Sequence, residues 1–196
     1  MSDSVPMTFA VLLGSVRSDR QGIKAARLLL AALEQRGHRA VLVDPMVTRL
    51  PLLDRMYKEY PQGQAPAELE QLAALYRGAD GFLLVSAEYN HGIPPALKNL
   101  LDHFLEEYFW RPSAIACYSA GGFGGVRAAM QLRMTLSELG MPSIPSVFSI
   151  PSIGTALADD GQPTDERTTR QMNRFLDEFQ WYAQALRAQR GQGTPY

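Results

Sequence analysis

Residues 81–99 read GFLLVSAEYNHGIPPALKN, and this stretch decides the fold. The apolar run at 81–85 is short enough to form a fully buried strand, and small and polar residues follow it. The pair Pro94-Pro95 then suits the first turn of a helix, which we expect to run over 95–104. The stretch therefore predicts a strand, a loop and the start of a helix.

The same alternation extends in both directions from this stretch. We expect strands at 8–13, 40–43, 81–85, 112–118 and 142–148, and helices at 23–36, 67–77, 95–104, 126–139 and from a Thr164 cap to about 190. Helices of this length supply the crossovers that parallel strands need. The pattern predicts an α/β fold, a doubly wound five-stranded parallel sheet in the order 2-1-3-4-5 with helices on both faces. Two prolines place the last strand at an edge.

Composition narrows the class of protein. The 196 residues suit one domain, which we expect to span residues 1–190, with residues 191–196 as a disordered tail. Nineteen basic and twenty acidic side chains leave a net charge of −1, without the basic excess of a nucleic-acid binder. We find no apolar run long enough for a membrane helix and no basic leader. The single cysteine, Cys117, reads as a buried thiol, so we expect a cytoplasmic protein.

Polar residues follow the first, third and fourth strands, whose carboxyl ends are neighbours in a 2-1-3-4-5 sheet. The first loop combines the hydroxyls of Ser15 and Ser18 with the guanidinium groups of Arg17 and Arg20 at the start of a helix. These groups suit a phosphate monoester, although a solvated polar turn would look similar. The loop is neither a Walker A motif nor the dinucleotide-binding fingerprint.

The other two loops complete a candidate site. Residues 88–91 place a carboxylate, a phenol, an amide and an imidazole together, or form a turn that tolerates unusual backbone angles. The glycine-rich residues 119–125 could hold a flat ring against backbone, with Phe123 as a wall, or could only be flexible. Ser119 is not in a Gly-x-Ser-x-Gly motif, which disfavours a hydrolase. No residues have convincing metal-ligand spacing.

Three motifs carry a family resemblance. They are Gly14 to Arg17 after the first strand, Glu88 to Asn99 after the third, and Ser119 to Gly125 with Arg127-Ala128 after the fourth. Together they resemble the NAD(P)H-dependent FMN reductase family, which has a flavodoxin-like fold and includes quinone, azo-dye and chromate reductases. The similarity covers residues 8 to about 150. Ala87 stands where the family commonly has Pro.

The resemblance implies an FMN site by position. It implies that the phosphate is held by Ser15, Arg17, Arg20, Gln21, Gly22 and Ile23. It implies that the ribityl chain and ring lie against Glu88, Tyr89, Asn90 and His91, with the far edge closed by Ser119, Gly121, Gly122, Phe123 and Gly124. No catalytic side chain is expected, because the flavin carries the chemistry.

The implied function is an oxidoreductase that passes hydride from NADPH or NADH through FMN to a quinone, flavin, azo compound or similar small acceptor. Two alternatives stay open. One is a flavodoxin-like electron carrier, which the net charge of −1 disfavours. The other is a non-catalytic flavin-binding protein.

A wide apolar surface over residues 96–110 indicates a homodimer or homotetramer. We expect the third helix and Tyr108-Phe109-Trp110 to form part of the subunit contact. The alternative is that these residues form a satellite cluster of the core.

Overall fold

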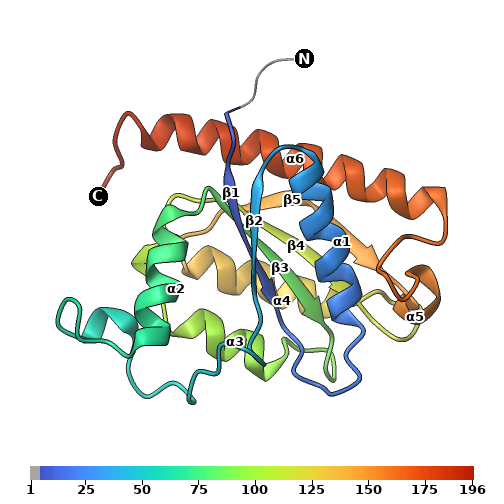
Figure 1. Ribbon diagram of the computed structural model, residues 1–196, viewed down its shortest axis with the longest axis horizontal. Coiled ribbons are helices and arrows are strands. Elements are labelled where there is room, and N and C mark those ends of the chain that lie inside the picture. Colours follow the sequence, from blue (N-terminus) through green and yellow to red (C-terminus); the bar gives the residue numbers. More distant parts are fainter. Residues whose placement is uncertain (1–4) are drawn as a thin grey trace.

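A computed structural model describes residues 5–196 and has one central sheet of five parallel strands in the order β2-β1-β3-β4-β5 (Figure 1). The strands are β1 (Thr8–Leu13), β2 (Arg39–Val43), β3 (Gly81–Ala87), β4 (Ser113–Tyr118) and β5 (Ser143–Ile150). The predicted fold class is confirmed, including the position of β5 at an edge.

Helices cover both faces of the sheet (Figure 1). The core on one face of the sheet contains side chains of α1 (Gly22–Gln35) and α6 (Glu166–Arg190). The core on the other face contains side chains of α2 (Ala67–Gly78), α3 (Pro95–Asp102) and α4 (Val126–Glu138). Alternation along β1 divides its side chains between the two cores, since Phe9 and Val11 enter the first and Ala10 and Leu12 the second.

Short elements lie in the connections. A single helical turn, α5 (Ile153–Ala156), follows β5, and two 3₁₀ turns lie at η1 (Tyr57–Glu59) and η2 (Glu106–Tyr108). After α6, the ring of Tyr196 lies 4.9 Å from that of Trp110. The domain limit at residue 190 and a disordered tail stay predictions.

The observed boundaries correct several details. Strand β3 runs two residues beyond the predicted end, because Ser86 and Ala87 stay in register with Cys117 and Tyr118 of β4. The cap of α6 is Asp165 rather than Thr164, because the N–H of Thr168 donates to its carboxylate at 2.8 Å.

The surface expected to contact another subunit is largely internal. Tyr108 and Phe104 are fully buried, and their rings pack with Tyr76 and Phe82 between α2, η2 and the sheet. The alternative interpretation, a cluster of the core, is therefore correct for these side chains. Tyr108 offers no surface to a second chain.

Two polar residues in the connections before β2 and β3, His38 and Asp80, are buried. The imidazole of His38 accepts a hydrogen bond from the N–H of Met7, and its other nitrogen contacts the side chain of Gln180 on α6. The carboxylate of Asp80 accepts bonds from the N–H of Thr8 and from Arg190. Both are covered by α6, which is remote from them in sequence.

Candidate functional site

The loops after β1, β3 and β4 surround one cavity of about 220 Å³ at the carboxyl end of the sheet. Of the residues singled out from the sequence, the cavity is lined by Ser15, Arg17, Arg20, Gln21, Glu88, Tyr89 and Ser119. It is also lined by Ala87, noted above only as a departure from the family, and by Asp19, Tyr118, Ala120 and Ile153, which were not predicted as site residues. The parallel order of the strands thus gathers polar groups that are about 100 residues apart.

Arg20 is held by an acidic partner at the edge of this cavity. Its guanidinium donates two hydrogen bonds to the carboxylate of Asp44, at 2.6 and 2.5 Å, and a third to the carbonyl of Ser15 at 3.0 Å. Burial acts to raise the pKa of Asp44, but the bonds from Arg20 and from the N–H of Met46 outweigh it and lower this pKa. Arg20 therefore fixes the first loop to the end of β2, and its charge is already compensated.

Arg17 differs from Arg20 because its side chain is largely exposed. Its only ion-pair partner among the described residues is the equally exposed Asp19, at 3.4 Å. Such an exposed pair contributes little to stability, so an anionic ligand can take the place of Asp19 beside Arg17. Arg17 is therefore the cation of the first loop that is available to a ligand.

The loop after β3 is a tight hairpin turn. Tyr89 and Gly92 exchange backbone hydrogen bonds of 3.1 and 2.9 Å, and the two residues between them, Asn90 and His91, have φ of 50° and 66°. The Tyr89 hydroxyl turns back and bonds the Ser15 hydroxyl at 2.6 Å. Asn90 and His91 are exposed and do not line the cavity.

Glu88 is engaged with the start of α4. One carboxylate oxygen accepts hydrogen bonds from the N–H groups of Arg127 and Ala128, at 3.0 and 3.3 Å, and the other pairs with the guanidinium of Arg127. Burial acts to raise the pKa of Glu88, but these donors outweigh it and lower this pKa. Although Glu88 borders the cavity, its charge is used to tie two loops together.

The glycine-rich loop after β4 is ordered by its own hydrogen bonds. The Ser119 hydroxyl accepts from the N–H of Gly124 at 2.8 Å and donates to the carbonyl of Gly121 at 2.7 Å. Gly124 has φ of 64°, and a Cβ there would lie 2.0 Å from Ser149 Oγ, so this position requires glycine. Phe123 is exposed beneath the Arg127 guanidinium and lies outside the cavity, as do Gly121 and Gly122.

Tyr118 is the main lining residue that sequence reasoning missed. It occupies the last position of β4, is 6% exposed, and its hydroxyl has no hydrogen-bond partner among the described residues. The run at 114–118 reads as an apolar strand, so the residue gave no signal of a polar role. The signal available was its position, immediately before a polar loop.

Helix α1 starts directly after Gln21, which lines the cavity, and its start has no capping side chain. Gln21 precedes the helix and makes no side-chain cap, and no acidic residue lies in the first turn. Gly22 and Ile23, the first two residues of the helix, are not among the residues that line the cavity. An unneutralised helix start beside Arg17 fits a phosphate group, because backbone N–H groups and the helix dipole both favour an anion there.

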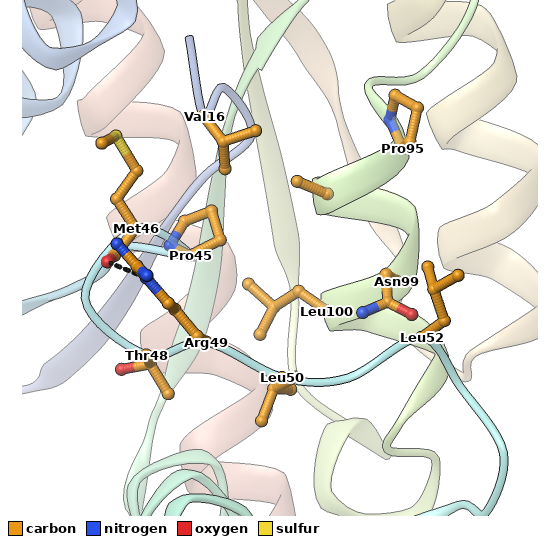
Figure 2. A pocket seen from close by; sticks show the side chains of 11 residues that line it. Val16, Pro45, Met46, Thr48, Arg49, Leu50, Leu52, Pro95, Asn99 and Leu100 are labelled. Atoms are coloured by element: carbon orange, nitrogen blue, oxygen red, sulfur yellow. Dashed lines mark hydrogen bonds between the residues drawn. The ribbon is translucent and has the colours of Figure 1, made fainter. Parts of the chain in front are cut away.

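A second, more apolar groove lies on the other side of the first loop (Figure 2). It has a volume of about 480 Å³ and runs between the segment after β2 and the start of α3. In Figure 2, Pro45 from that segment lies opposite Leu100 of α3, and Leu52 lies beside Asn99. Asn99 holds the two walls together, accepting from the N–H of Leu53 at 2.9 Å and donating to the carbonyl of Pro51 at 2.8 Å.

Within residues 5–196, no three His, Cys, Asp or Glu side chains are grouped as a metal ion would require. The helices of the same range include none that is both long and apolar enough to cross a bilayer.

Comparison with known proteins agrees with this architecture. The family model described as NADPH-dependent FMN reductase matches residues 7–155, which contain all three loops of the cavity. The chain belongs to this family. A quinone reductase of Pseudomonas putida is 29% identical over 185 residues, covering 91% of this chain and 96% of that protein. A quinone reductase of Escherichia coli is 31% identical over 141 residues, covering 68% of this chain and 71% of that protein.

A solved structure extends the comparison to three dimensions. The flavoenzyme NAD(P)H:(acceptor) oxidoreductase of Paracoccus denitrificans has a TM-score of 0.76, with 25% identity over 91% of this chain and 98% of that chain. The family membership predicted from the three loop motifs is confirmed. The protein is an NAD(P)H-dependent oxidoreductase with FMN as its cofactor.

Proposed function

We propose that the cavity between the three loops binds FMN and that the apolar groove beside it admits the diffusible acceptor. This proposal rests on one observation: an uncapped helix start and the exposed Arg17, paired only with the exposed Asp19 among residues 5–196, lie beside the loops that follow β3 and β4. When bound, FMN supplies the hydride acceptor for NADPH or NADH and the donor for the second substrate.

The residues of the chain then have distinct roles. Arg17, Gln21 and the first amides of α1 bind the phosphate, while Arg20 and Ser15 hold the first loop in shape. The residues of the other two loops that line the cavity, 87–89 and 119–120, lie against the ribityl chain and ring. Glu88 positions the second loop against α4 and does not itself bind the cofactor.

The acceptor class follows from the groove. Its walls are mostly apolar, with Thr48, Arg49 and Asn99 as the polar side chains, which suits a flat aromatic molecule such as a quinone. The names of the Pseudomonas putida and Escherichia coli relatives support the same acceptor class.

One experiment tests these points together. Purified protein titrated with FMN is expected to quench flavin fluorescence, and the complex is expected to consume NAD(P)H with a quinone over many turnovers. Leu52→Ser should raise the KM for the quinone and leave FMN affinity unchanged, whereas Leu53→Ser, next to the groove but not lining it, should change neither. Folded protein that bound no FMN would contradict the proposal, and flavin reduction without turnover would favour an electron carrier.

We also propose that the protein works as a homodimer or homotetramer in the cytoplasm. A stripe of exposed apolar side chains on α4, formed by Val126, Met130 and Met134, supports a subunit contact. The buried Cys117, a free thiol, supports a reducing compartment.

A further inference from the structure

Within residues 5–196, the Tyr118 hydroxyl is a buried polar group without a hydrogen-bond partner. The side chain comes from the end of β4 and lines the cavity together with Ser15, Arg17 and Gln21. A buried hydroxyl that makes no hydrogen bond carries a desolvation cost, so a ligand that accepted one from it would remove that cost.

The hydroxyl reaches the start of α1. A Cβ built on Gly22 would lie 2.1 Å from Tyr118 Oη and 2.6 Å from Cζ, so the tyrosine occupies the space that a side chain at position 22 would need. Gly22 is the first residue of the 14-residue helix α1, whose first amides have no capping side chain. The phenol therefore lies beside a helix end that favours an anion.

We propose that Tyr118 donates a hydrogen bond to the phosphate monoester of FMN and makes the site prefer FMN over riboflavin. This inference rests on the proposed function, since it assigns a further contact within the same cavity. The phosphate would then be met by backbone N–H groups of α1, by the guanidinium of Arg17 and by a neutral phenol.

The protonation state of Tyr118 agrees with a donor role. Burial, with a smaller contribution from the neighbouring Tyr89, raises the pKa of Tyr118 to about 12 against the opposing effects of Ser15, Arg20 and the backbone of Gly22. The phenol is therefore protonated at neutral pH and can give its hydrogen to a phosphate oxygen.

The test compares FMN with riboflavin in Tyr118→Phe. We expect the dissociation constant for FMN, from fluorescence quenching, to rise roughly tenfold, and that for riboflavin to stay within about twofold. The ³¹P resonance of bound FMN should shift between the two proteins. Tyr182→Phe, which also removes a phenol but lies on α6 outside the cavity, serves as the control and should change neither constant. Thermal unfolding of each variant checks that the fold is kept.

Inorganic phosphate separates the anion contact from the rest of the ligand. Free phosphate should compete with FMN in the wild-type protein and compete less well in Tyr118→Phe. Equal weakening of FMN and riboflavin, or no change in either, would overturn the inference and leave the proposed function in place. A wild-type protein that bound neither flavin would overturn the proposed function, and the inference with it.

Discussion

Two arginines in one loop have different functions because they have different neighbours. Arg20 and Asp44 are both largely buried and share two short hydrogen bonds, whereas Arg17 projects into solvent. The sequence presents them as equivalent phosphate ligands. Only the fold shows that Arg20 is already paired with Asp44, 24 residues away, so that Arg17 alone of the two is available to a ligand.

Replacing Arg17 by Ala should weaken FMN binding several-fold more than riboflavin binding, because a charged contact to the phosphate is lost while the ring contacts stay. The difference should shrink as salt is added, since Arg17 is exposed. Titration of both flavins at two ionic strengths measures this. Equal losses for both flavins would assign Arg17 a structural role.

Arg20→Ala provides the contrast with this variant. It leaves the Asp44 carboxylate buried without its cation, so we expect the free energy of unfolding to fall by about 3 kcal/mol. Riboflavin and FMN affinities should fall together, because the loop that holds both is loosened.

At the scale of the element, Glu88 matters as the cap of α4. Helix α4 starts after Gly125, and because glycine has no side chain it cannot cap the first N–H groups of the helix. The carboxylate of Glu88 takes this role from the loop after β3. The helix, both loops and Arg127 therefore form one unit.

Glu88→Ala should lower the free energy of unfolding by about 2–3 kcal/mol, because two helix N–H groups and the Arg127 guanidinium lose their acceptor. Glu88→Gln, which keeps an acceptor, should cost less. Urea denaturation measures both. Glu166→Ala removes an exposed i,i+4 pair with Arg170 and should have almost no effect. Unchanged stability with loss of FMN binding would instead make Glu88 a ligand of the cofactor.

The order of elements could be predicted from the sequence because each buried strand is a short apolar run and each helix has a regular apolar spacing. The three loops could be predicted because they follow those strands. The partners of Arg20, Glu88 and His38 could not, since each lies on an element remote in sequence. Tyr118 was hidden because its neighbours in the strand are apolar, and the turn at α5 is too short to have a periodic pattern.

At the scale of the whole molecule, His38 connects the two ends of the chain. It joins the N–H of Met7, before β1, to Gln180 on α6. Burial, with a smaller contribution from Arg36, lowers the pKa of His38 against the opposing effect of Asp80. The folded protein therefore keeps this imidazole neutral at a pH where the unfolded chain would protonate it.

This lowered pKa gives stability a defined pH dependence. The contribution is fully present above the unfolded pKa of about 6.5 and is lost as the pH falls through the lower folded value. The free energy of unfolding should therefore decline from pH 7 to pH 5, and His38→Gln should reduce the decline. His91→Asn, at an exposed turn, is the control. Parallel slopes in the wild type and His38→Gln would contradict the assignment.

The proposed assembly is also a property of the whole molecule. Met134→Glu places a charge on the exposed stripe of α4, and a two-fold contact would present that charge twice. Light scattering should therefore show a lower mass than for the wild type. Trp181→Glu, equally exposed on α6, should keep the wild-type mass. A monomeric wild-type protein at micromolar concentration would exclude the assembly.

Because Tyr118 lies so close to Gly22, the residue types at these two positions, 96 residues apart in sequence, constrain each other during evolution. A tyrosine at the end of β4 is compatible only with glycine at the start of α1, because any Cβ there would overlap the phenol. Among relatives of this chain, a larger residue at position 22 should therefore occur only with a smaller one at position 118. Such covariation would indicate two lineages of the family that bind the FMN phosphate with different side chains.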